Sequence, residues 1–237
     1  MVEYVDQVVS RYQLSSVIWM WEFGNEFNAY ANLSNATKWW PKVNVSQGTP
    51  ARRSVHDLIT TASCANAFAH FGKVVRRLDP TRRITAGTDI PRYNASNLAI
   101  GRWGADSPMQ FHAALKQVTP NPLDVVSVHL YPNREDQYFG WGASSKFADI
   151  LSEVMSFGRH YEKEVFVGEF GVPRMKDIDV EQMLFRRLLD AIVNARVNWA
   201  ALWVYDLMSQ DEWSVRFDNA RAWQLEMVAQ ANEFIKV

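Results

Sequence analysis

Short apolar segments alternate with longer amphipathic segments along this chain. The short runs are predicted to be strands, and the segments with apolar residues three or four positions apart are predicted to be helices. The predicted strands cover residues 17–23, 83–88, 124–130, 164–169 and 199–205. The predicted helices cover about residues 2–12, 54–78, 108–118, 145–161, 180–195 and 220–235. Strands that alternate with helices form parallel sheets with right-handed crossovers, so we expect an α/β fold with about five parallel strands.

The composition fits one globular unit. The chain has 237 residues, of which 48% are hydrophobic and 22% charged, and its net charge is -1. A chain of this size can bury a sizeable core. It has no internal repeat, low-complexity tract or linker, so we expect a single domain over residues 1–237. No basic run suits a phosphate backbone, and no apolar stretch reaches the roughly 18 residues of a membrane helix, so neither nucleic acid nor membrane is an expected partner.

The sequence gives no signal for a cofactor or a catalytic metal. Its one cysteine, Cys64, lies in a predicted helix and is expected to be a small buried residue rather than a nucleophile. The histidines in or near predicted helices lack ligand spacing, and no H-E-x-x-H or C-x-x-C pattern occurs. Residues 1–13 do not resemble a secretion signal, which leaves two alternatives for location, a cytoplasmic protein or a fragment of a secreted enzyme.

Two predicted strands end in a glutamate. The segment VIWMWEFGNEFN, residues 17–28, runs into Asn25 and Glu26, and the segment VFVGEFGVP, residues 165–173, carries Glu169. The C-terminal ends of barrel strands are where barrel enzymes place their active sites. A pair of carboxyl groups is also what hydrolysis of a glycosidic bond requires. The simpler alternative is that both are acids of surface loops, but the matching strand ends favour a shared site.

Strand parity separates the residues that face helices from those that face inward. In residues 124–132, the apolar positions Val126, Val128 and Leu130 share one face, and Ser127, His129 and Tyr131 share the other. His129 alone could be a satisfied core histidine, but its polar neighbours on the same face favour a site. In the first strand, Glu22 has the parity of Glu26 and is expected to lie beneath it as a structural partner of an inward cation rather than as a third catalyst.

The order of these motifs resembles the clan of retaining glycoside hydrolases that contains the cellulase-like and mannanase-like enzymes of family 5. The motifs are Asn25-Glu26 after a strand, H-x-Y-P at residues 129–132, GEFG at residues 168–171 and a final strand with Trp203. The resemblance implies a TIM-type barrel in which Glu26 is the acid/base and Glu169 the nucleophile. It also implies that Asn25 contacts the sugar 2-hydroxyl, that His129 and Tyr131 line the site with Tyr131 orienting the nucleophile, and that Trp203 lies under the reacting sugar.

The chain departs from that clan at its beginning. The strand that ends at Glu26 corresponds to the fourth barrel strand, which normally follows three strand-helix units of about 30 residues each. Only residues 1–16 precede it here, so we expect a partial barrel equivalent to strands 4 to 8. The arginine and histidine that the clan usually supplies from earlier strands are also missing. Open sheet edges are normally paired or covered, so we expect a homodimer, with self-closure of a five-strand barrel or cover by the loop 29–50 as alternatives.

Four tryptophans in loops after strands are candidates for stacking against sugar rings, with packing in the core as the alternative. They are Trp39, Trp40, Trp141 and Trp213. The sequence therefore predicts a retaining β-glycosidase acting on a β-linked glucan, a mannan or small β-glycosides by double displacement. The alternative is a catalytically impaired carbohydrate-binding or scaffold half-barrel that kept its glutamates.

Overall fold

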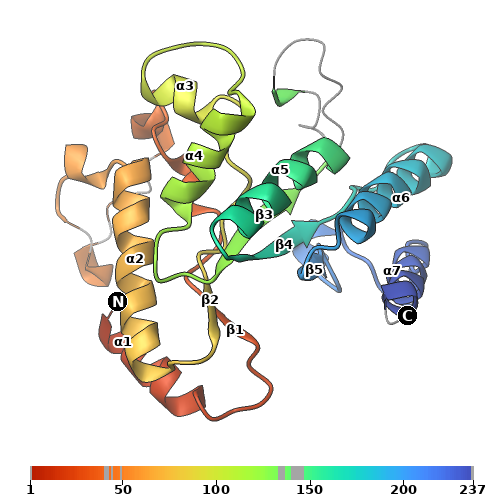
Figure 1. Ribbon diagram of the computed structural model, residues 1–237, viewed down its shortest axis with the longest axis horizontal. Helices are drawn as coiled ribbons and strands as arrows, with labels where there is room; N and C mark the ends of the chain where they lie inside the picture. The colour runs from red at the N-terminus through yellow and green to blue at the C-terminus, as the bar shows by residue number, and fades with distance from the viewer. Residues whose placement is uncertain are drawn as a thin grey trace.

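A computed structural model describes residues 2–39, 43, 45–48, 50–132, 137–139 and 147–235 (Figure 1). Its strands are β1 (Met20–Glu22), β2 (Arg83–Thr85), β3 (Val125–Leu130), β4 (Glu164–Phe170) and β5 (Trp199–Leu202). Its α-helices are α1 (Val2–Tyr12), α2 (Thr61–Leu78), α3 (Ala95–Ala99), α4 (Pro108–Val118), α5 (Phe147–His160), α6 (Ile178–Ala195) and α7 (Trp223–Ile235). The predicted α/β class, a partial barrel with five parallel strands, is confirmed. None of the described helices is long and apolar enough to cross a membrane.

The strands form two parallel sheets rather than one continuous ladder. β1 pairs with β2, and β3, β4 and β5 pair in that order. A few bonds join the sheets where β2 meets β3: the backbone N–H of Asp124 donates to the carbonyl of Ile84 at 3.0 Å, and the Thr88 hydroxyl donates to the carbonyl of Ser127 at 2.9 Å. These bonds join the two sheets into one curved surface, and the C-terminal ends of its parallel strands lie on the same side.

Capping residues place the helix starts. Ser107 caps α4 in a capping box with Gln110, and Pro108 occupies the first turn, as the sequence predicts. The predicted helix 54–78 begins later, because Thr60 forms a capping box with Ser63 and Ser54 instead caps a short 3-10 helix. The helix α3 and further 3-10 helices lie in segments that the sequence predicts as loops. These are η1 (Phe27–Tyr30), η2 (Ala36–Trp39), η3 (Val45–Gln47) and η6 (Met208–Gln210), whereas η4 (Val55–Asp57) lies within the predicted helix 54–78.

Two hydrophobic clusters lie between the strands and the helices. The larger contains Val126, Val128 and Leu130 of β3 together with residues of α4, α5 and α6, so the predicted helix-facing parity of this strand is confirmed. The smaller joins α1 and α2 to β2, with Ile84 fully buried, and it includes Cys64. Figure 1 shows α1 and α2 beside β1 and β2, and α5 and α6 beside the other sheet. Burial raises the pKa of the Cys64 thiol, in line with the predicted structural role.

The inner face between β1 and β5 is open. Among the described residues, neither strand has a partner on its outer edge. Val17 and Trp19, predicted to belong to the first strand, are 78% and 69% exposed and lie outside it, because the ladder with β2 begins only where Met20 pairs with Arg83. Trp19 reaches across to Trp199 at the start of β5, with ring centroids 5.8 Å apart. The described start of the loop 29–50 is instead attached to α2, where the Asn32 amide donates to Thr61.

Candidate active site

A sharp turn after β1 positions Glu26. Its backbone lies in the left-handed region at φ 55°, and its N–H donates to the carbonyl of Gly87 at 2.8 Å. Gly87 has φ +66°, and a Cβ there would lie 2.1 Å from the carbonyl oxygen of Gly24. Glycine is therefore required where the loop after β2 meets the turn that carries Glu26.

A register shift in β4 positions Glu169. Val128 is paired with Val167, but the next residue of β3, His129, is paired with Glu169, so Gly168 is the extra residue. A Cβ at Gly168 would lie 2.9 Å from Nε2 of His129. The glycine thus leaves room for the imidazole, and the shift places the Glu169 side chain next to it.

His129 lies between the two glutamates. Its Nδ1 lies 2.7 Å from Glu26 Oε1 and 3.3 Å from Glu169 Oε2, so these two oxygens are at most 6.0 Å apart. The Tyr131 hydroxyl donates to the same Glu169 oxygen at 2.5 Å. His129 and Glu169 are buried at 3% and 7% exposure. Two carboxyl groups from segments distant in sequence therefore lie beside one imidazole.

The electrostatics of the cluster set opposite tendencies. Burial raises the pKa of Glu169, the hydrogen bond from Tyr131 and the charge of His129 lower it, and the net direction is upward. Burial alone would lower the pKa of His129, but the hydrogen bond with Glu26 and the charges of Glu169, Glu26 and Asp89 raise it. The pKa of Tyr131 is raised by burial and by its hydrogen bond to Glu169, so this hydroxyl stays protonated and acts as a hydrogen-bond donor.

A cavity of about 290 Å³ opens onto these groups. Trp203 and Trp213 form part of its wall, the Trp203 indole donates to Gln210 at 3.0 Å, and the Tyr131 and Trp213 rings meet edge to face at 5.1 Å. The complete lining is Asn25, Glu26, Asp89, Ile90, His129, Leu130, Tyr131, Tyr138, Phe147, Ile150, Glu169, Trp203, Gln210 and Trp213. Polar groups and aromatic faces in one cleft suit a ligand rich in hydroxyl groups.

Most of the predicted site residues meet in this cavity. Seven of them line it: Asn25, Glu26, His129, Tyr131, Glu169, Trp203 and Trp213. Trp40 and Trp141 lie outside the described residues, and Trp39 ends the helix η2 with a side chain that is not described. The sequence reasoning missed Asp89 and Gln210, which follow strands but belong to no motif.

Glu22 does not have the predicted cation beside it. Among the described residues, no arginine or lysine forms an ion pair with Glu22, which faces the open side near Trp19 and Phe166. Desolvation raises the pKa of its carboxyl, the charge of His129 opposes this rise, and the charge of Glu169 adds to it. The reason is that Arg83, the inward cation of β2, pairs with Glu164 at the other end of the strands.

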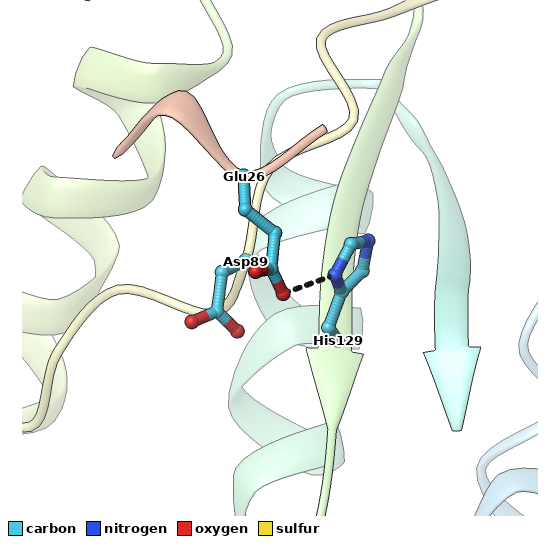
Figure 2. Close-up of side chains that lie close together, drawn as sticks. All are labelled: Glu26, Asp89 and His129. Carbon is cyan, nitrogen blue, oxygen red and sulfur yellow. Dashed lines mark hydrogen bonds and ion pairs between the residues drawn. The ribbon is translucent and has the colours of Figure 1, made fainter. Parts of the chain in front are cut away.

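A third carboxylate, Asp89, completes a compact group with Glu26 and His129. Each of the three offers one possible metal-ligand atom, a carboxylate oxygen or an imidazole nitrogen, and these three atoms lie within 4.8 Å of one another. Figure 2 shows the Glu26 carboxylate directed at the imidazole, with the Asp89 carboxylate beside it. The imidazole nitrogen that would face a cation is already hydrogen-bonded to Glu26, so we assign no cation to this group.

Comparison with known proteins places the chain among carbohydrate-active barrels. The family model described as cellulase (glycosyl hydrolase family 5) matches residues 1–208. No curated protein matches the chain significantly. Among solved structures, the endo-1,4-β-mannanase from Rhizomucor miehei is 15% identical with a TM-score of 0.61, and the match covers 97% of this chain and 60% of that one.

Two further solved structures give the same result. The endo-β-1,4-mannanase from Thermotoga petrophila is 14% identical with a TM-score of 0.58, and the match covers 98% of this chain and 49% of that one. Cel5A from Thermotoga maritima, solved with a mannotriose substrate, is 15% identical with a TM-score of 0.55, and 94% and 63% of the two chains are covered. At these identities the likeness shows the fold. The chain spans about half to three fifths of the length of these structures.

Proposed function

The chain belongs to glycosyl hydrolase family 5, and on that premise we propose that it hydrolyses β-linked glucans, mannans or small β-glycosides with retention of configuration. The proposed reaction is a double displacement at Glu26 and Glu169. The solved structures similar to it include enzymes named as mannanases and an endoglucanase, which supports a β-linked polysaccharide as the substrate class.

The contact of both glutamates with one imidazole nitrogen carries the proposal. Retaining enzymes hold their two carboxyl groups about 5–5.5 Å apart, and inverting enzymes hold them about 6.5–9.5 Å apart. Glu26 Oε1 and Glu169 Oε2 are at most 6.0 Å apart, because they lie 2.7 Å and 3.3 Å from the same nitrogen, His129 Nδ1. This upper bound lies below the separation of inverting enzymes and favours direct attack by one carboxylate on the sugar.

Each glutamate then has one role. Glu169 attacks the anomeric carbon while Glu26 gives its proton to the departing glycosidic oxygen, which forms a covalent glycosyl-enzyme. Glu26 next takes a proton from water, and the resulting hydroxide displaces Glu169 and releases the sugar. Tyr131, which donates to Glu169 Oε2, would hold that carboxylate in line for attack.

The walls of the cavity fit the sugar. Trp203 and Trp213 line it and would present apolar faces to the pyranose rings, and Asn25 would contact the 2-hydroxyl beside Glu26. The Trp203 indole nitrogen donates to Gln210, which fixes the plane of this ring. Hydrogen bonds would then orient the sugar, and stacking would contribute apolar contact area.

Glutamate variants test the assignment. Turnover of an activated aryl β-glycoside should fall to background in Glu169→Gln, because no nucleophile remains. Glu26→Ala should slow substrates with poor leaving groups by about 10²–10⁴-fold and activated ones less, and azide should restore turnover of activated substrates. Glu153→Gln, a change on α5 outside the cavity lining, is the matched control and should behave like the wild type. Full activity of Glu169→Gln would refute the proposed role.

The open inner face favours a second candidate function. The chain spans about half of the length of the Thermotoga petrophila mannanase, and among the described residues β1 and β5 have unpaired outer edges, which suits a catalytically impaired carbohydrate-binding or scaffold half-barrel. A wild-type chain that binds β-gluco- and β-manno-oligosaccharides in calorimetry but turns over neither class would support this candidate against the enzyme.

A further inference from the structure

A buried aspartate lies beside the proposed acid/base. Asp89 is 5% exposed and lines the cavity. One of its carboxylate oxygens lies within 4.8 Å of a carboxylate oxygen of Glu26 and of an imidazole nitrogen of His129 (Figure 2). It comes from the loop after β2, whereas Glu26 follows β1 and Glu169 lies in β4. Burying a carboxylate is costly unless the surrounding groups compensate for its charge. Its position next to a second carboxylate therefore needs a reason.

The loop holds Asp89 in a fixed place. The side-chain amide of Asn28 donates to the carbonyl of Asp89 at 2.7 Å, and the N–H of Asp89 donates to the Asn28 side-chain oxygen at 3.0 Å. The Asp89 carboxylate also accepts from the N–H of Ile90 at 2.8 Å. Because Asn28 is buried and follows Glu26 by two positions, this clamp fixes the loop of Asp89 against the turn of Glu26.

The clamp uses backbone atoms of Asp89, and the side chain lies close enough to Glu26 and His129 for its charge to act on them. Glu26 and His129 share a hydrogen bond of 2.7 Å, so a proton on this pair is available to the glycosidic oxygen. An ionised neighbour disfavours the loss of that proton, because it would leave two like charges close together. Asp89 is also among the charges that raise the pKa of His129.

We propose that Asp89 is a positioning residue whose negative charge retains the proton on the Glu26–His129 pair while Glu169 is ionised. This inference rests on the proposed function, because the proposed hydrolysis needs one carboxyl protonated and the other ionised in the same cleft. The titratable groups that also act on the pair are Glu169, Tyr131 and Glu22, and Glu169 Oε2 lies 3.3 Å from the same His129 nitrogen that contacts Glu26. Asp89 lies next to Glu26, as Figure 2 shows.

Asp89→Asn tests the inference, because it removes the charge and keeps both the shape and the backbone clamp. The control is Asp106→Asn, since Asp106 is 2% exposed, accepts from the N–H groups of Ser96 and Asn97, and is not part of the cavity lining. The titration of His129 is followed by NMR of the labelled imidazole nitrogens. The pKa of His129 should be lower in Asp89→Asn than in the wild type and unchanged in Asp106→Asn.

The rate profile supplies a second measurement. The alkaline limb of kcat/KM for an aryl β-glycoside should move to lower pH in Asp89→Asn and stay in place in Asp106→Asn. An unchanged His129 titration in Asp89→Asn, or an equal shift in both variants, would overturn the inference. If Asp89→Asn does not fold, Asp89→Ala tests the same loss of charge, and the wild-type titration must still show a raised His129 pKa. If the wild type turns over no glycoside but its His129 titration still differs from that of Asp89→Asn, the proposed function is refuted while the effect of Asp89 on His129 stands.

Discussion

Tyr131 donates a hydrogen bond to the proposed nucleophile, Glu169. Its hydroxyl donates to Glu169 Oε2 and favours the ionised carboxylate, opposing the burial that raises the pKa. In Tyr131→Phe the pKa of Glu169 should rise further, so the acid limb of kcat/KM should move to higher pH. A hydrogen bond to a charged group contributes about 1.5–3 kcal/mol. Tyr138→Phe is the control, because Tyr138 lines the same cavity but donates to the carbonyl of Pro91. A shift toward lower pH in Tyr131→Phe would contradict this account.

Strand ends and parity predict the location of Glu26, Glu169 and His129, because inward residues near the C-terminal ends of parallel strands lie at the same edge of the sheet. Asp89 could not be predicted in this way. It lies beyond the end of β2, and its position depends on the clamp with Asn28, which only the folded chain brings together. The register shift at Gly168 has no local sequence signal either, because it depends on how β4 pairs with β3 in the folded chain.

At the scale of elements, a buried ion pair holds the segment after β5. Arg221 is 2% exposed and donates to Glu181 at 2.9 Å, to the carbonyl of Glu212 at 2.9 Å and to the carbonyl of Val172. It thus joins α6 and the segment after β4 to the loop that carries Trp213. Arg221→Met should lower the free energy of unfolding by about 3–5 kcal/mol, because Glu181 would remain buried without its cation.

Urea unfolding followed by circular dichroism measures this loss. The double variant Arg221→Met/Glu181→Leu should recover most of it, because no uncompensated charge remains. The control is Arg174→Met, which removes an exposed pair with Asp211 and should cost less than about 1 kcal/mol. Equal losses in Arg221→Met and Arg174→Met would rule out the anchoring role.

Element types follow from sequence more readily than element ends. Periodicity predicts α1 and α4 over the residues where they occur, because their apolar stripes and the Pro108 start are local signals. It extends the first strand to residues 17–23, whereas β1 contains Met20–Glu22, since pairing with a neighbouring strand decides where a strand stops. The break between the two sheets, at β2 and β3, also depends on strand pairing, and no residue pattern in the sequence predicts it.

At the scale of the whole molecule, we propose that a second copy covers the open face. This face contains the exposed Val17 and Trp19 and a hollow of about 480 Å³ that also involves Phe166 and Trp199. A two-fold axis along the strands would place β1 of each copy parallel to β5 of the other and close both edges. The chain should therefore sediment as a dimer at micromolar concentration.

Trp19→Glu should weaken this dimer, because it places a charge in the apolar contact. Trp103→Glu is the control, since Trp103 is 87% exposed elsewhere on the molecule. A wild-type chain that stays a stable, active monomer would contradict the shared face and would require the contact of Trp19 with Trp199 to close the gap within one chain. The number and order of strands predict this open face, but they do not determine what covers it.

Trapping of the covalent intermediate tests the central claim most directly. A deoxyfluoro β-glucoside or β-mannoside with a dinitrophenyl leaving group slows the second displacement, so the glycosyl-enzyme accumulates. Digestion and mass spectrometry should then find one sugar attached to the peptide that contains Glu169, and none in Glu169→Gln. Attachment to another residue, or turnover of glycosides with no attachment at all, would contradict double displacement at Glu169.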